Sequence, residues 1–339
     1  MHQGWYEAFQ ALGVEVFSYN LNDRLIFYST ALKDTHTQDE HGLPIVQQYL
    51  SQDQAFHMAM QGLPDVLLKL WPDVVVFVSA FFTTESTFAL LRARKFKTVL
   101  IHTESPYQDD AQLQRAEMAD LNLLNDAANI EKYLELGVPA YYQPHSYRPE
   151  VHHPREGGID RDLASDLCFI GTAFPSRYEF FSKLDLTNVD VLLGGSEWGK
   201  LKKGDPLAQY VGTGVETEAD CIDNTQAADL YRNAKMGINF YRREGEPEHE
   251  NDVALAMGPR EVEMAACGLP FLRDPREEGD KILHMLPTFG SPGDASEKLR
   301  WWLDHPEQRF HAASLAREAV IDRTFENAAR GLLHRLEKL

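Results

Sequence analysis

The sequence predicts an α/β protein made of two doubly wound, Rossmann-like domains that face each other across a cleft. Its 339 residues suffice for two domains of roughly 100–200 residues each. Apolar strand-like runs alternate with helical patterns in both halves, as in right-handed βαβ crossovers of a parallel sheet. At residues 145–164 the alternation stops, and proline, glycine and charge dominate. We therefore place one domain at 1–150, a second at 151–320, and a final helix at 321–339.

The N-terminal half shows strand and helix patterns in turn. The clearest is 71–81, a continuous apolar run of the kind that is buried in parallel sheets. Other strands are expected at 14–20, 97–105, 118–126 and 140–144, and helices at 3–12, near 43–50, at 84–94 and at 129–137. A sheet of this type normally opens with a strand and a glycine-rich turn before its first helix, and that opening is not visible here.

A second alternating series follows residue 164. Strands are expected at 165–172, 190–195, 236–242 and 269–274, and helices after Arg177 and at 225–235, 259–268, 296–306 and 310–339. In open α/β sheets the ligand lies beyond the carboxyl ends of the strands. The residues that follow strands are therefore the functional candidates, namely His102, Glu104, Gly171, Thr172, Gly194, Gly195 and the 258–263 stretch.

Composition limits the partners. The formal net charge of −19 disfavours nonspecific nucleic-acid binding, which needs Lys and Arg surfaces, and a stable hold on anionic lipids. No stretch approaches the roughly 20 apolar residues of a membrane-spanning helix, and the polar opening shows no secretory signal. Cys168, Cys221 and Cys267 show neither a disulfide framework nor zinc spacing, which suits a reducing cytoplasm.

The segment 257–274 carries the strongest chemical signal. Gly258 precedes a helix, and Pro259 is suited to its first turn. Such a helix start offers backbone N–H groups and partial positive charge to a diphosphate. Arg260 opposes the helix dipole there, an anomaly that a bound anion would relieve. Glu263 lies three residues further on and shares a helix face with Arg260. Its carboxylate is suited to accepting hydrogen bonds from the two hydroxyls of a ribose. The alternative is a solvated ion pair that contributes only about 0.2–0.5 kcal/mol.

Here the sequence resembles a known family. Glu263-Met-Ala-Ala-Cys-Gly-Leu-Pro270 is similar to the E-A-x-A-C-G-x-P signature of group 1 glycosyltransferases. With Arg260 included, it is closest to the R-x-x-E-x-x-A-C-G form of the spore-maturation (CgeB-like) glycosyltransferase family. The segments SDLCFIGTAFPSR, VDVLLGGSEW and AADLYRNAKMGINFYR resemble the same family in order, as do the connection before them and the C-terminal helices. The resemblance extends from about 140 to 335.

The resemblance implies a GT-B fold whose last helix crosses back to the N-terminal domain, and a nucleotide diphosphate-sugar donor, with a UDP-sugar as first expectation. Carried onto matching positions, Glu263 would bind the donor ribose, and Arg260 with the backbone of 258–261 would bind the diphosphate. The donor-binding set it implies is Gly258, Pro259, Arg260, Glu263, Gly171, Thr172, Arg177, Gly194, Gly195 and Asn239. Many group 1 enzymes carry a second Glu eight residues earlier, where this chain has Leu255.

Catalytic candidates lie in the N-terminal half. Inverting sugar transfer needs a general base near the acceptor hydroxyl, and His102 or Glu104 would serve. The alternative is a histidine that ends a strand and a glutamate in a solvated loop. His145 in the connection is a further candidate, although a histidine at a hinge is commonly a packed residue. His152 and His153 are expected to be exposed.

Other functions are less well supported. The chain has no P-loop and no G-x-G-x-x-G after a strand. The D-x-D at 160–162 follows no apolar strand, so we interpret it as linker charge. No metal cofactor is expected if Arg260 and the helix start neutralise the leaving diphosphate. The acceptor stays open between a glycan, a small molecule and a modified base in DNA. A nucleotide-sugar epimerase and a non-catalytic nucleotide- or glycan-binding relative are the alternatives.

Overall fold

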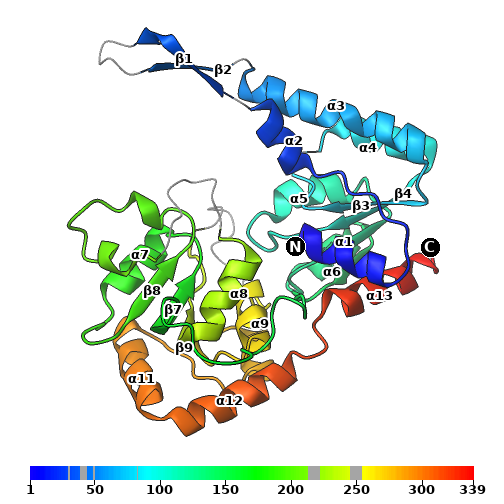
Figure 1. Ribbon diagram of the computed structural model, residues 1–339. Helices are drawn as coiled ribbons and strands as arrows, with labels where there is room; N and C mark the ends of the chain where they lie inside the picture. Colours follow the sequence, from blue (N-terminus) through cyan, green and yellow to red (C-terminus); the bar gives the residue numbers. More distant parts are fainter. Residues whose placement is uncertain (30, 39–43, 49, 82, 213–221, 245–253) are drawn as a thin grey trace.

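Two parallel four-stranded sheets covered by helices form the body of the protein (Figure 1). The computed structural model describes residues 1–29, 31–38, 44–48, 50–81, 83–212, 222–244 and 254–339. A short antiparallel hairpin of β1 and β2 projects away from both sheets. The predicted pair of α/β domains is confirmed. Within the described residues, every helix is too short or too polar to cross a bilayer.

The first sheet has the strand order β3-β4-β5-β6, and all of its pairs are parallel. The elements of this domain are α1 (His2–Ala11), α2 (Leu21–Tyr28), β1 (Ala31–Gln38), β2 (Pro44–Gln48), α3 (Gln52–Leu70), β3 (Val74–Val78), α4 (Glu85–Arg94), β4 (Lys97–Ile101), α5 (Asp109–Ala116), β5 (Leu121–Leu124), α6 (Ile130–Glu135) and β6 (Ala140–Tyr142).

Two predictions about this half are wrong. Residues 14–20 form no strand, although Val14 and Val16 are partly buried against the domain core, because no neighbouring strand pairs with them. The helix expected near 43–50 is strand β2, which pairs antiparallel with β1, and helix α3 begins only at Gln52.

The strands of the first sheet follow one another in space, so right-handed crossovers place α4, α5 and α6 on one face. The other face is covered by both ends of the chain, where α1 and the last helix, α13 (Phe325–Leu336), pack together (Figure 1). Their shared core contains Trp5, Ala8, Phe9, Val99, Ile101, Leu121, Leu123, Phe325, Ala328, Ala329 and Leu332.

The second sheet has the order β10-β9-β7-β8. Its elements are β7 (Ser165–Ile170), α7 (Pro175–Ser182), β8 (Val191–Gly194), two 3₁₀ turns (Trp198–Lys200 and Ala208–Tyr210), α8 (Asn224–Asn233), β9 (Ala234–Asn239), α9 (Pro259–Ala266), β10 (Phe271–Arg273), α10 (Glu277–Ile282), α11 (Pro292–Asp304) and α12 (Pro306–Ala319). The chain reverses its direction after β8, so β7 and β9 flank a topological switch point, where such sheets bind ligands.

Two chain segments connect the domains side by side. Residues 145–164 form no helix or strand, as predicted. Within them, Tyr147 makes an isolated parallel bridge to Thr324 on the returning chain. The Tyr147 N–H donates to the Arg323 carbonyl (2.8 Å), and the Phe325 N–H donates to the Tyr147 carbonyl (3.1 Å). The outgoing segment 145–164 and the returning segment 320–324 are therefore hydrogen-bonded to each other, and we call this pair of segments the hinge.

Candidate functional site

Helix α9 begins at the carboxyl edge of the second sheet. Gly258 is its N-cap, and Pro259 occupies the first helical position, where its fixed φ fits and no N–H is required. The Gly258 N–H already donates to the Glu261 Oε2 atom (2.9 Å) and to the Tyr241 hydroxyl (3.1 Å). The Gly258 N–H, one of the groups expected to bind a diphosphate, thus already donates to acceptors within the protein. We therefore assign a larger share of diphosphate binding to the Arg260 side chain.

Arg260 and Glu263 share one face of α9, as their spacing predicts. Arg260 Nη1 donates to Glu263 Oε2 at 2.7 Å, and only 7% of the Glu263 side chain is exposed, against 31% for Arg260. The adjacent Glu263 carboxylate raises the pKa of Arg260, against the opposing effect of burial. Because the carboxylate is buried, the pair differs from the solvated ion pair of the alternative interpretation, and loss of either partner would leave an uncompensated charge.

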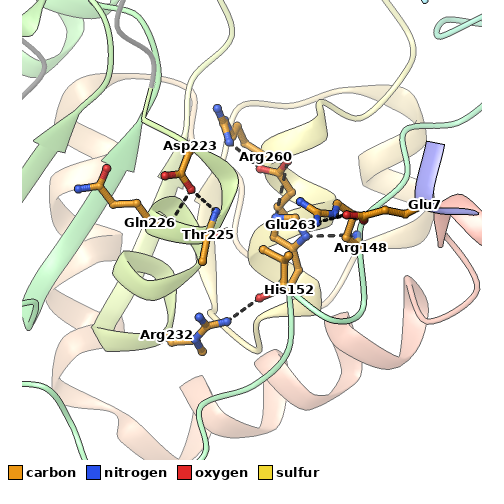
Figure 2. A network of polar contacts seen from close by, with 10 residues as sticks. Glu7, Arg148, His152, Asp223, Thr225, Gln226, Arg232, Arg260 and Glu263 are labelled. Atoms are coloured by element: carbon orange, nitrogen blue, oxygen red, sulfur yellow. Dashed lines mark hydrogen bonds and ion pairs between the residues drawn. The ribbon is translucent and has the colours of Figure 1, made fainter. Parts of the chain in front are cut away.

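His152 lies beside this pair, contrary to the expected exposure (Figure 2). Its Nε2 atom is 3.9 Å from Glu263 Oε1, and burial lowers the pKa of its imidazole, with Glu263 opposing. The prediction failed because 148–152 is a turn, in which the His152 N–H donates to the Arg148 carbonyl (2.8 Å). This turn directs His152 inward, whereas His153 is half-buried.

Glycines at the carboxyl ends of β7 and β8 bring two turns together. The Gly171 N–H donates to the Gly194 carbonyl (2.8 Å), and the Trp198 indole donates to the Gly171 carbonyl (2.8 Å). Gly195 has φ +119°, and a Cβ there would lie 2.5 Å from the Gly171 oxygen. Close approach of backbone to backbone therefore requires Gly195 even without a ligand.

Arg177 is held at the start of α7 by backbone oxygens. Its Nε donates to the Phe240 carbonyl (3.0 Å) and its Nη1 to the Thr172 carbonyl (3.1 Å). The guanidinium carbon lies 5.4 Å and 5.3 Å from the ring centres of Phe169 and Phe174. Burial lowers the pKa of Arg177 to about 10, so it stays charged at neutral pH. A fixed cation at the switch point is suited to an anionic ligand.

Two buried polar groups near the end of β9 keep an atom with no hydrogen-bond partner among the described residues: Asn239 Nδ2 and Glu261 Oε1. Asn239 is among the site residues predicted from the sequence, whereas Glu261 is not. Burial raises the pKa of Glu261 to about 7, and its other oxygen accepts from the Tyr241 hydroxyl. A glutamate at the third helical position after an N-cap is a capping signature, which is the signal that would have found it.

The two catalytic candidates do not converge. His102 is buried, its Nε2 is 2.9 Å from Asn122 Oδ1 within the first domain, and burial lowers the pKa of its imidazole. Glu104 instead reaches the other domain, where its Oε2 accepts from Arg242 Nη2 at 2.9 Å. His145 is buried at the hinge, and burial lowers its pKa to about 4, which makes it a weak base at neutral pH.

Comparisons with known proteins agree with the fold described above. Residues 177–334 match the family model described as glycosyl transferase-like. Sucrose-phosphate synthase from Thermosynechococcus elongatus has a similar structure (TM-score 0.60, 14% identity, 98% of this chain and 91% of that chain covered). The structure of trehalose-6-phosphate from E. coli bound with UDP-2-fluoro glucose is also similar (TM-score 0.55, 12% identity, 85% of this chain and 78% of that chain covered). Anabaena HepE in complex with UDP and glucose is a third similar structure (TM-score 0.56, 11% identity, 81% of each chain covered). The fold is GT-B. No curated protein matches the sequence.

In this GT-B chain the domains meet through a carboxylate that the sequence did not indicate. Asp126, after β5, accepts the N–H groups of Leu255 and Ala256 on Oδ2, both at 2.9 Å. Position 255 lacks the second Glu of many group 1 enzymes, yet its backbone receives a carboxylate from the opposite domain. Burial raises the pKa of Asp126, and these hydrogen bonds counter the shift. Nothing in the local sequence around position 126 signals a contact 129 residues away.

A second contact between the GT-B domains centres on Glu278 of α10. Its Oε1 accepts from the Tyr142 hydroxyl (2.6 Å) and from Arg323 (2.6 Å), and its Oε2 accepts from the Met257 N–H (2.7 Å). These bonds fix the segment before α9 against the hinge. Within the described ranges, no three His, Cys, Asp or Glu side chains gather to form a metal site.

Proposed function

We propose that this chain is a glycosyltransferase that moves a sugar from a nucleotide diphosphate-sugar to an acceptor hydroxyl. The observation that carries the proposal is the Arg260–Glu263 ion pair at the start of α9, in which the Glu263 carboxylate is buried and Arg260 is partly exposed. It lies in the glycosyl transferase-like part of a GT-B fold, beside the switch point of the sheet. The R-x-x-E spacing further supports a place in the spore-maturation (CgeB-like) family.

The donor would bind along the carboxyl edge of the second sheet. Glu263 would accept hydrogen bonds from the ribose hydroxyls, while Arg260 and Arg177 would bind the diphosphate. Gly171, Thr172, Gly194, Gly195 and Asn239 would line the sugar and nucleotide path. A UDP-sugar is the first choice, since two of the similar structures were solved with UDP or a UDP-sugar.

The reaction needs a group on the acceptor side. The acceptor oxygen would attack the anomeric carbon as the bond to the diphosphate breaks, and its proton would pass to a base. Glu104 is at the domain contact, whereas the His102 ring nitrogen is bonded to Asn122 inside its own domain. We therefore prefer Glu104 over His102 as the base. Arg260 and Arg177 would stabilise the leaving diphosphate without a metal.

The acceptor would be a glycan, a small molecule or a modified base in DNA. The formal net charge of −19 weighs against nucleic acid. A cytoplasmic setting is proposed from the cysteines, since Cys168 and Cys267 are buried free thiols.

A thermal-shift panel tests the donor site. UDP, GDP, ADP, CMP, NAD and the common nucleotide-sugars are added to the wild type, to Glu263→Gln and to Glu277→Gln, an exposed control on α10. A ligand at 100 times its Kd stabilises by about 2.7 kcal/mol. We expect one nucleoside diphosphate to stabilise the wild type and the control but not Glu263→Gln. A panel without any shift would refute the donor site.

Turnover assays then separate the alternatives. Transfer requires an acceptor, whereas an epimerase changes the donor sugar when no acceptor is present. Binding of the donor without turnover across a broad acceptor screen would favour the non-catalytic relative. In each case the product is followed by mass spectrometry of the donor and of the released nucleotide.

A further inference from the structure

His152 has a buried hydrogen-bonding atom that faces Glu263 and is otherwise unsatisfied (Figure 2). The residue is 2% exposed, and Nε2 has no hydrogen-bond partner among the residues that the structure describes. A buried polar group left without a partner costs about 1–3 kcal/mol. The nearest charged acceptor is Glu263 Oε1, at 3.9 Å.

The other ring nitrogen determines where the His152 proton lies. Nδ1 is 3.2 Å from the Arg148 backbone nitrogen, whose N–H donates to it. Nδ1 is therefore the acceptor, and in the neutral ring the hydrogen is on Nε2, pointing toward Glu263. Glu263 uses its other oxygen, Oε2, for Arg260. A shortening of about 1 Å would bring Nε2 and Oε1 to hydrogen-bond distance.

The turn that carries His152 is attached to both domains. Arg148 makes two hydrogen bonds of 2.7 Å to the carboxylate of Glu7 on α1. On the other side, Arg232 Nη1 of α8 donates to the Val151 carbonyl at 2.6 Å. The linker turn is thus fixed between the first helix of one domain and a helix of the other, with His152 projecting from it onto α9.

We infer that His152 is a positioning residue for Glu263: its Nε2–H fixes one carboxylate oxygen while Arg260 fixes the other. The inference rests on the proposed role of Glu263 in donor binding and adds the linker to the donor site. With both oxygens directed, the carboxylate presents its remaining lone pairs in one orientation to the ribose. The linker position then determines how well the donor binds.

Two substitutions separate the ring nitrogens of His152. In His152→Asn the amide oxygen can replace Nδ1 toward the Arg148 N–H, but nothing reaches the place of Nε2. In His152→Gln the longer amide can place a donor near Nε2. We expect His152→Asn to raise the Kd for UDP and the donor KM about tenfold, with kcat at saturating donor within about threefold. His152→Gln should stay within about threefold in all three, as should the control His153→Gln.

The opposite order would overturn the inference: a normal His152→Asn with a weakened His152→Gln means that the residue only shapes the linker through Nδ1. Equal behaviour of both variants and the control would overturn it as well. Thermal unfolding of each variant without ligand identifies any loss of binding that comes from misfolding.

A ligand-free measurement keeps the inference testable if no nucleotide binds. The histidine ring signals are titrated by NMR in the wild type and in Glu263→Gln, and His152 is assigned by the signal lost in His152→Gln. Removal of the facing carboxylate should lower the pKa of His152. An unchanged pKa would refute the pairing. Failure of UDP and the other nucleotides to bind the wild type would instead refute the proposed function, independently of this result.

Discussion

The two domains place their candidate groups in different ways. On the donor side, Arg260 and Glu263 are one helical turn apart on α9, and the helix alone brings them to 2.7 Å. On the acceptor side, the Glu104 and Asp126 carboxylates both accept hydrogen bonds from the other domain, and Asp126 Oδ1 also accepts the Ala128 N–H within its own domain (2.9 Å). The donor pair is therefore a property of a local segment, whereas the contacts of Glu104 with Arg242 and of Asp126 with Leu255 exist only when the two domains are docked.

The largest effect is expected from breaking the donor pair. Arg260→Met leaves the Glu263 carboxylate buried without its cation, which should lower the free energy of unfolding by about 3 kcal/mol. Glu263→Gln should lower the free energy of unfolding by less, because it removes the buried charge. The double variant should recover part of the stability that Arg260→Met loses. Both single variants should weaken binding of the nucleoside diphosphate by about 100-fold. Urea unfolding and calorimetry measure these values, and wild-type stability of Arg260→Met would contradict the buried pair.

Ionisation of Glu261 is expected to change the free energy of unfolding by a similar amount, and this change depends on pH. Because its folded pKa is raised from 4.5 to about 7, its contribution is complete below about pH 4.5 and is lost as the pH rises through 7. Glu261→Gln should remove this loss, so the variant should gain up to about 3 kcal/mol relative to the wild type between pH 4.5 and 8. Urea unfolding at several pH values tests this, and parallel curves for both proteins would disprove it.

On the acceptor side, Glu104→Gln should lower kcat about 100-fold, equivalent to about 2.7 kcal/mol, while donor affinity changes little. Arg242→Gln is the matched variant, since it removes the ion pair and keeps the carboxylate. If Arg242→Gln reproduces the loss in full, Glu104 acts only by holding the domains together. His102→Gln should have a smaller effect on kcat than Glu104→Gln.

The smallest effect is expected at Asp126. In Asp126→Asn, one orientation of the amide points its nitrogen at the N–H groups of Leu255 and Ala256. In the other orientation the amide oxygen faces them, and this oxygen is a weaker acceptor than a carboxylate oxygen. We expect a loss of about 1–2 kcal/mol in unfolding free energy. The donor KM should rise with it, because the segment before α9 is released from the other domain. A stability loss with an unchanged KM would show that the domain contact does not shape the donor site.

The sequence predicted the α/β architecture, most strands and the Arg260–Glu263 geometry, because these depend on periodicity and on the helical repeat. It failed where partners are distant. Residues 14–20 have strand-like residues but no strand to pair with, and 44–48 form a strand only because 31–38 lie opposite. His152 is in a polar, proline-rich segment that suggests exposure, and only the turn at Arg148 directs it inward. Contacts such as that of Asp126 with position 255 leave no local pattern.

The packing of α13 on α1 also has a consequence for the order in which the chain folds. A ribosome releases the N-terminal residues first, and domains commonly fold in the order of synthesis. Here one face of the first sheet lacks Phe325, Ala329 and Leu332 until the final helix emerges. The second domain, contiguous from Ser165 to Ala319, has all of its own elements earlier. The domain synthesised first is thus the last to complete its core, and its unfinished sheet face must stay soluble while the remainder of the protein is made.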